Sequence, residues 1–221
     1  VVCLCLTDGA AGGDGLFGEQ GIGARLEPGA GIVDFSTIGP ERTRELAQRL
    51  ATEAPGTRWV DAPVTGGVRG AENGELVILC GGAEQDVAAV RPVLDPLAKR
   101  VCHLGGLGSG QAAKLCNQLT VGTNVIAIAE ALALGRAHGL DIAALPDALA
   151  GGWADSLPLQ IIGPRMAAGG AEPAIVSVGT YAKDLALVMQ GMPGRAGGEG
   201  LAAHALALLQ QALGEGLGAA D

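Results

Sequence analysis

Short apolar runs alternate with segments of helical periodicity over the first hundred residues. The apolar runs are the length of buried strands, and the segments between them have apolar residues spaced three to four apart. The pattern predicts strands at 1–6, 31–35, 58–63, 75–80 and 101–104, with helices near 15–24, 40–53 and 84–98. Strands that alternate with helices are typical of an α/β domain with a mostly parallel sheet. The connection from 58–63 to 75–80, about a dozen residues, is at the lower limit for a parallel crossover.

The pattern changes after Gly108. No further β-rich run follows, and helical periodicity is found near 109–138, 141–150, 155–168, 179–190 and 199–213. Ser109 can cap the first of these helices. We therefore place a boundary near residue 107, between an α/β domain at 1–107 and an all-helical domain at 108–221.

Composition excludes several classes of protein. With 48% hydrophobic and 17% charged residues in 221, the chain is not disordered. The net charge of −9 disfavours binding to nucleic acid or to an anionic membrane. With 2% aromatic residues the chain also has few side chains on which bases could stack. Neither the five cysteines nor the three histidines have the spacing of a disulfide framework or a metal site, and reduced cysteines favour the cytoplasm. Glu130 interrupts the longest apolar stretch, so we predict no membrane-spanning helix.

Residues 13–18 form a G-x-G-x-x-G pattern, the fingerprint of a dinucleotide-binding turn, and Asp34 follows at a suitable distance for a ribose contact. The fingerprint belongs in the tight turn between a strand and a helix. Here residues 7–13 separate the strand at 1–6 from Gly15. Because the chain contains 38 glycines, chance matches are expected, and we interpret this one as coincidental.

Four other motifs carry more information: Asp-Phe-Ser-Thr-Ile-Gly-Pro at 34–40, Asp-Ala-Pro-Val-Thr-Gly-Gly at 61–67, Gly-Ser-Gly-Gln-Ala-Ala-Lys-Leu-Cys-Asn-Gln at 108–118 and Lys-Asp-Leu at 183–185. In order and spacing they resemble the β-hydroxyacid dehydrogenase family, which contains 3-hydroxyisobutyrate dehydrogenase and tartronate semialdehyde reductase. The resemblance covers nearly the whole chain. It implies an NAD(P)-dependent oxidoreductase with a Rossmann-type domain followed by a helical domain. In that family the strand resembling 1–6 is internal, so we expect this Rossmann-type domain to be incomplete at its N-terminus.

Lys114 is the candidate catalytic residue. On a helix, Gln111, Asn117 and Gln118 share its face. Spacing alone leaves two interpretations open: a solvated polar face, or a buried lysine that acts as general acid toward a carbonyl oxygen. The resemblance implies the second. The family usually has Asn where this chain has Gln118, so either Gln118 or Asn117 would hold the substrate oxygen.

Thr65, Gly66 and Gly67 follow a predicted strand, where a hydroxyl and close backbone amides can bind an anion. An ordinary turn is the alternative. The resemblance implies that they hold the substrate carboxylate, although the family usually has Ser in place of Thr65. We interpret Asp61 as structural, because an Asp at a strand end commonly caps a loop.

Ser36 and Thr37 also follow a strand end, where open α/β sheets collect ligands, and they can equally cap the next helix. The resemblance implies that Thr37 lies beside the nicotinamide and that Asp184 orients a lysine on the cofactor side. The implied cofactor-binding residues are Leu6, Thr7, Thr37 and Lys183.

The predicted function is reversible hydride transfer between NAD or NADP and a short 3-hydroxy acid, a small anionic substrate. A 6-phosphogluconate-type dehydrogenase is a weaker alternative, because the helical part is short and offers no clustered Arg for a phosphate. A non-catalytic fragment or helical oligomer is the other alternative. The Ala- and Leu-rich helices near 112–134 and 201–213 predict a homodimer or higher homo-oligomer.

Overall fold

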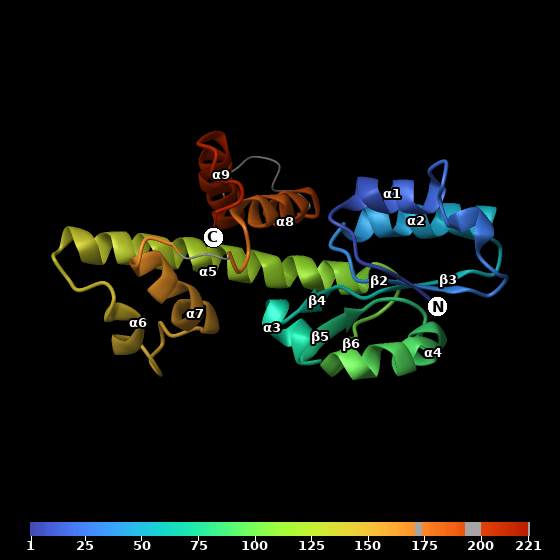
Figure 1. The fold of residues 1–221 in the computed structure, drawn as a ribbon, viewed down its shortest axis with the longest axis horizontal. Helices are drawn as coiled ribbons and strands as arrows, with labels where there is room; N and C mark the ends of the chain where they lie inside the picture. Colours follow the sequence, from blue (N-terminus) through green and yellow to red (C-terminus); the bar gives the residue numbers. More distant parts are fainter. Residues whose placement is uncertain (171–173, 193–199, 221) are drawn as a thin grey trace. The chain divides into compact units, whose positions relative to one another are not determined.

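The computed structural model describes residues 1–170, 174–192 and 200–220 (Figure 1). Its contacts divide the chain into two compact units, Val1–Cys116 and Asn117–Asp221. The division falls inside one continuous helix, α5 (Ser109–Ala137), a little after the boundary that the sequence pattern indicates.

The first unit contains two three-stranded sheets. In the first, all strands are parallel, in the order β1 (Val2–Leu4), β2 (Gly31–Asp34) and β3 (Arg58–Asp61). The second has the order β4 (Val64–Thr65), β5 (Leu76–Cys80) and β6 (Ala98–His103). In this sheet β5 and β6 are parallel, whereas β4 pairs antiparallel with β5. The short connection after β3 thus forms β4 and the short helix α3 (Gly67–Glu72), and an antiparallel bridge between Asp61 and Gly81 joins the two sheets.

Helices cover both faces of the parallel strands, as Figure 1 shows. On one face Ile32 and Trp59 pack in a buried cluster with residues of α1 (Gly9–Phe17) and α2 (Pro40–Glu53). On the other face Val33 and Val60 pack with residues of α4 (Glu84–Leu94), which the 3₁₀ turn Asp95–Leu97 follows. Successive side chains of a strand point to opposite faces, so strands covered on both sides need the continuous apolar runs seen in the sequence.

Helix α1 corrects one sequence prediction. The helix expected near 15–24 begins at Gly9 and ends at Phe17, and a separate 3₁₀ turn follows at Gly23–Arg25. It begins early because the Asp8 carboxylate accepts the amides of Ala10 and Ala11, both at 2.9 Å. Gly13 and Gly15 therefore lie inside a helix, and the G-x-G-x-x-G pattern does not form a strand-to-helix turn.

The second unit is helical over its described residues, with α6 (Leu145–Ala148), α7 (Leu157–Ala167), α8 (Val178–Gln190) and α9 (Leu201–Gly214) following α5. Helices α8 and α9 pack against each other, and α6 packs against α7. The helix expected at 141–150 is reduced to the single turn of α6, because the Asp141 side chain accepts the Ala143 amide and forms a turn instead.

By length and composition, α5 is the one described helix that could cross a membrane, with a mean hydropathy of 1.3 over its best window. The sequence prediction excluded such a span because of Glu130. The core helices of soluble proteins can be equally long and apolar, and 33% of this α5 window is buried. Ile128 and Leu132 of α5 are buried in a cluster with Leu159 of α7.

Candidate functional site

The loops that follow β1 and β2 are joined at the carboxyl edge of the parallel sheet. The Leu6 amide donates a hydrogen bond of 2.9 Å to the Ser36 hydroxyl oxygen. Ser36 is buried, whereas Thr37 is half-buried and Thr7 is exposed. Ligands of open α/β sheets bind at this edge. The three predicted cofactor residues of this unit, Leu6, Thr7 and Thr37, therefore belong to two adjoining loops, and each is at least partly exposed.

Asp34 is the last residue of β2, and its buried side chain supports the loop that follows at the same edge. Its side chain is 2% exposed, and it accepts the Ser36 amide at 3.0 Å. Burial raises the pKa of this carboxyl, while the hydrogen bonds from Ser36 oppose the shift. A buried carboxylate held by the backbone two residues on is not placed to bind a ribose, so this second half of the formal fingerprint also fails.

Asp61, the last residue of β3, holds the start of α5. Its fully buried carboxylate accepts the amides of Gly108 and Gln111, at 2.8 and 2.9 Å. Burial raises the pKa of Asp61, and the amide hydrogen bonds act against that rise. Its role is structural, as the sequence indicated, but it caps a helix from another part of the chain. The α5 cap expected from Ser109 is thus supplied by Asp61.

Gly108 and Gly110 permit this close packing of the α5 start. Gly108 has a φ of 89°, a backbone conformation that residues with a side chain rarely adopt. A Cβ on Gly110 would overlap the carbonyl oxygen of Leu79 in β5 and lie 2.9 Å from that of Asp61. Both glycines of the Gly-Ser-Gly motif are therefore needed where the helix begins against the strand ends.

Gln111 departs most from its predicted environment. Instead of sharing a solvated face with Lys114, its side chain is fully buried. Its carbonyl oxygen accepts the amides of Ile38 and Gly39 at 3.1 and 3.0 Å, and its amide donates to the Ser36 carbonyl at 2.7 Å. Sequence reasoning missed this role, and the only available signal was the position of Gln111 within the motif.

Lys114 is half-buried on α5, one turn after Gln111. In the same unit Thr65 is half-buried at the end of β4, and Gly66 and Gly67 are exposed at the start of α3. Their φ angles are 129° and 63°, so glycine is required at both positions. The sequence motif at 65–67 therefore forms an accessible turn whose backbone only glycines adopt readily.

The second unit brings together the other predicted residues. The Gln118 amide donates to the Asp184 carboxylate, and its carbonyl oxygen accepts from the Asn117 amide at 2.8 Å. The other carboxylate oxygen of Asp184 lies 3.0 Å from the Lys183 Nζ. Asp184 is 3% exposed and Gln118 is 7% exposed. Both ends of the Gln118 amide are thus engaged within the protein, and the Asp184 carboxylate forms an ion pair with Lys183.

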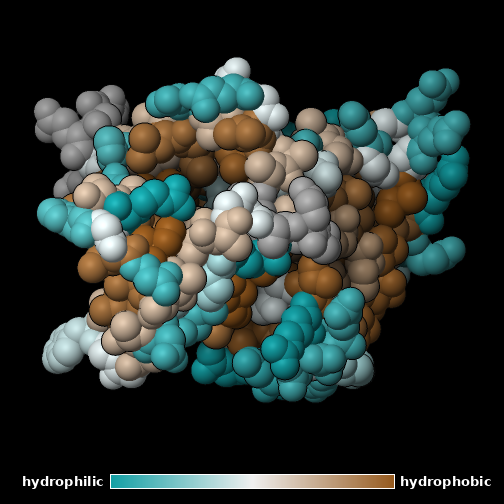
Figure 2. All heavy atoms as spheres, turned by 60° about the vertical axis from the view of Figure 1, so that its left-hand side comes forward, coloured by the Kyte–Doolittle hydropathy of each residue, from teal (hydrophilic) through white to brown (hydrophobic). Residues whose placement is uncertain are grey.

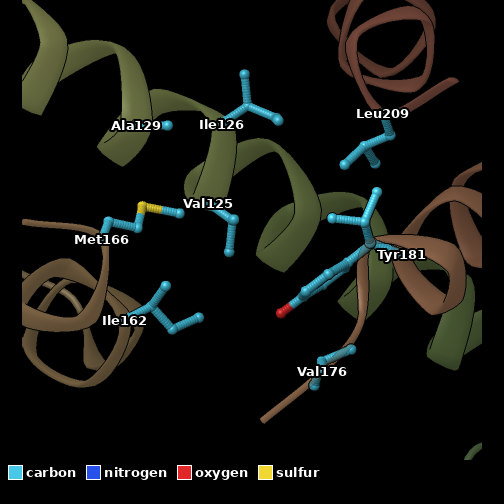
Figure 3. Close-up of a pocket in the computed structure, with 9 residues that line it drawn as sticks. Val125, Ile126, Ala129, Ile162, Met166, Val176, Tyr181 and Leu209 are labelled. Carbon is cyan, nitrogen blue, oxygen red and sulfur yellow. The ribbon is translucent and has the colours of Figure 1, made fainter. Parts of the chain in front are cut away.

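An apolar cavity of about 120 Å³ lies in the second unit, and none of these residues lines it (Figure 3). Tyr181 contributes the only polar side-chain atom among the lining residues, so the cavity does not suit a small anion. The lining consists of Val125, Ile126, Ala129, Ile162, Met166, Val176, Val178, Tyr181 and Leu209.

Within the described residues, no group of three or more His, Cys, Asp or Glu side chains is arranged to hold a metal ion. The candidate chemistry therefore rests on a lysine, amides, hydroxyls and backbone N–H groups.

Comparison with known families matches both halves of the chain. Residues 1–105 match the NAD-binding domain of 6-phosphogluconate dehydrogenase, and residues 108–221 match the NAD-binding domain of NADP-dependent 3-hydroxyisobutyrate dehydrogenase. These matches and the fold define the class of the chain, an α/β NAD-binding domain followed by a helical domain. The chain belongs to the β-hydroxyacid dehydrogenase family, that of 3-hydroxyisobutyrate dehydrogenase.

Individual relatives agree with this assignment. The 3-hydroxyisobutyrate dehydrogenase of Pseudomonas aeruginosa is 43% identical over 124 residues, which are 56% of this chain and 41% of that protein. The mitochondrial human enzyme is 40% identical over the same length, covering 56% of this chain and 36% of that protein. The chain spans less than half the length of the curated relatives it matches.

Solved structures give the same fold over almost the whole chain. A 3-hydroxyisobutyrate dehydrogenase from Salmonella typhimurium has a TM-score of 0.89 at 27% identity, covering 99% of this chain and 75% of that one. The Mycobacterium tuberculosis enzyme, solved with L-serine, has a TM-score of 0.83 at 29% identity, and the match covers 100% of this chain and 76% of that one. A third relative, with a TM-score of 0.88 at 26% identity, was solved with NADP⁺, and the match covers 99% of this chain and 76% of that one.

The cofactor of this family is NAD or NADP. At the carboxyl edge Thr7 is exposed and Thr37 is half-buried, while the neighbouring Ser36 and Ile38 are buried. The N-terminus of α1, by contrast, already carries the Asp8 carboxylate, which would repel a pyrophosphate. The N-terminus of α1 therefore does not suit the phosphates of the cofactor.

Proposed function

We propose that this chain takes part in the reversible, NAD(P)-dependent oxidation of a short 3-hydroxy acid to its semialdehyde. One observation carries the proposal: the start of α5 is fixed to both the β3 end and the Ser36–Gly39 loop. The helix that bears Lys114 is thus anchored to the loop that bears Thr37. This gives the predicted proton-transfer residue and the predicted cofactor loop a common, rigid support.

Substrate binding is assigned to the turn at Thr65, Gly66 and Gly67. Two successive glycines with positive φ let backbone N–H groups converge, which favours an anion such as a carboxylate. The Thr65 hydroxyl adds a further donor. Because the net charge of the chain is −9, such local donors must hold the anion against the overall field.

Proton transfer is assigned to Lys114. In oxidation its Nζ accepts the proton of the substrate hydroxyl, and in reduction it returns that proton to the forming alkoxide oxygen. Bound NAD(P) supplies the hydride acceptor or donor. The protein contributes the position of the substrate oxygen and the protonation state of Lys114.

The second unit contributes an amide and a cation. Gln118 uses both ends of its amide on Asn117 and Asp184, so we assign the substrate oxygen to Asn117, whose Nδ2 has a second hydrogen to donate to it. Lys183, held by Asp184, is assigned to the cofactor. The extra methylene of Gln118, relative to the family's usual Asn, supports this exchange of roles.

Steady-state kinetics of the full protein with a panel of 3-hydroxy acids, including 3-hydroxyisobutyrate and glycerate, and either NAD⁺ or NADP⁺ test the proposal. Lys114→Met should lower kcat about 10²–10⁴-fold, the usual contribution of a general acid or base. The matched control is Lys99→Met, since Lys99 is exposed on β6. Absence of turnover by the wild type with the whole panel refutes the function. A Lys114→Met enzyme with more than a tenth of the wild-type rate refutes the role of Lys114.

A further inference from the structure

The side chain of Gln111 holds three backbone groups of the Ser36–Gly39 loop, while Asp34 holds a fourth, the Ser36 amide. Gln111 accepts hydrogen bonds from the Ile38 and Gly39 amides and donates one to the Ser36 carbonyl, at 3.1, 3.0 and 2.7 Å. These contacts lie on both sides of Thr37 in the chain. Ser36, Ile38 and Gly39 are buried, so within this loop Thr37 alone remains partly open.

Glutamine is matched to this position by its chemistry. Its carbonyl oxygen can accept two amides while its NH₂ group donates to a carbonyl, so one side chain satisfies three backbone groups. Glutamate could accept the same two amides but could not donate to the Ser36 carbonyl. A buried backbone group without a hydrogen-bond partner costs about 1–3 kcal/mol of stability. A residue that left the Ser36 carbonyl unpaired would therefore destabilise this loop.

The other end of Gln111 is also fixed. Its backbone amide donates to the buried Asp61 carboxylate at 2.9 Å, which ties this turn of α5 to the end of β3. Gly110, just before it, has no room for a Cβ against β5. Gln111 therefore connects a helix start that is bonded to β3 and packed against β5 with the Ser36–Gly39 loop.

We propose that Gln111 is a positioning residue that sets the distance between Thr37 and Lys114. It touches no reacting atom and acts through the loop backbone on one side and through α5 on the other. This inference rests on the proposed function, in which Thr37 lies beside the nicotinamide and Lys114 transfers the proton. When a reaction needs two groups held at a fixed distance, a displacement near 1 Å can lower its rate about 10²-fold.

Two variants and a control test this role. Gln111→Met keeps the side-chain volume and removes all three hydrogen bonds, whereas Gln111→Glu keeps the two amides and loses the bond to the Ser36 carbonyl. Val90→Ala, in the core between the sheet and α4, is the control for a general loss of stability. Each protein is characterised by its melting temperature, by kcat and KM, and by amide hydrogen exchange at Ile38 and Gly39.

For Gln111→Met we expect faster exchange at Ile38 and Gly39, an NAD(P)H dissociation constant raised about threefold or more, and kcat lowered about 10–100-fold with a smaller change in the hydroxy-acid KM. Gln111→Glu should give an intermediate effect. Val90→Ala should lower the melting temperature without these local changes. Unchanged exchange in Gln111→Met, or a kcat loss equal to that of Val90→Ala, overturns the inference.

A wild-type protein without dehydrogenase activity would bear on the proposed function and not on the positioning role of Gln111. It refutes the proposed function, while loop exchange and NAD(P)H affinity still decide whether Gln111 positions the Ser36–Gly39 loop. If the wild type is inactive, faster exchange with weaker NAD(P)H binding in Gln111→Met supports the positioning role. Unchanged NAD(P)H affinity in that variant overturns it.

Discussion

Two carboxylates at the ends of neighbouring strands organise the carboxyl edge of the sheet. Asp34 binds the Ser36 amide, and Asp61 binds the amides of Gly108 and Gln111. Both are almost inaccessible, and burial raises both pKa values. Each charge is thus partly unfavourable in the folded state, yet each supplies the acceptor that a loop or a helix start requires.

The raised pKa of Asp34 predicts a particular pH dependence. A folded-state pKa above the ordinary 3.8 means that the folded protein holds this proton while the unfolded chain has lost it. The Asp34 contribution to stability is therefore most favourable near pH 4 and below, and it declines as the pH rises through the raised pKa. Asparagine keeps an oxygen for the Ser36 amide without the charge.

We accordingly expect Asp34→Asn to melt at a higher temperature than wild type at pH 7, with the difference shrinking as the pH approaches 4. Thermal melts across this range measure it. Asp155→Asn is a suitable control, because the pKa of Asp155 is lowered, chiefly by the Gly151 amide, so its pH dependence has the opposite sign. A difference that grows toward low pH would contradict the assignment for Asp34.

At the scale of elements, glycines in the two helices α1 and α5 show opposite requirements. Gly15 is exposed inside α1, and a Cβ there would meet only Leu6, at an ordinary contact distance of 3.8 Å. Gly110 is buried at the start of α5, where a Cβ would overlap the Leu79 carbonyl oxygen. The same residue type is therefore replaceable in one helix and necessary in the other.

Alanine substitution tests this contrast. Gly15→Ala should stabilise the protein by about 1 kcal/mol, because alanine is the better helix former. It should leave the NAD(P)H affinity within twofold of wild type. Gly110→Ala should destabilise by about 1–3 kcal/mol through overpacking against fixed backbone. Denaturant unfolding and NAD(P)H titration give both quantities. A tenfold loss of NAD(P)H affinity in Gly15→Ala would restore the glycine fingerprint at 13–18.

The sequence predicts elements best where packing follows a simple period. The helix expected at 40–53 is found at Pro40–Glu53, because its apolar residues recur at helical spacing and Pro40 begins it. The α1 start was missed, since it depends on the Asp8 carboxylate rather than on periodicity. Likewise, the motif around Lys114 was recognised, but the partner loop of Gln111 was not. Contacts between residues distant in the chain depend on tertiary register, which a single sequence does not reveal.

At the scale of the whole molecule, hydrophobic side chains reach the surface in several places, shown in brown in Figure 2. Several of the most exposed lie in the second unit, where Leu134 is 62% exposed, Leu157 73% and Leu201 67%. Trp153 is fully exposed in the same unit. Large exposed apolar areas usually mark an interface. This distribution favours association through the second unit.

We therefore predict that the protein forms a homodimer or a higher homo-oligomer, and that the second unit supplies the contacts. Leu134→Lys combined with Leu157→Lys should shift it toward monomer, because a buried unpaired charge is costly at an apolar interface. Leu104→Lys is the matched control, since Leu104 is 47% exposed but belongs to the first unit. Sedimentation velocity at several concentrations measures the outcome. A wild-type monomer at all concentrations, or dissociation by Leu104→Lys alone, would show that these surfaces have another role.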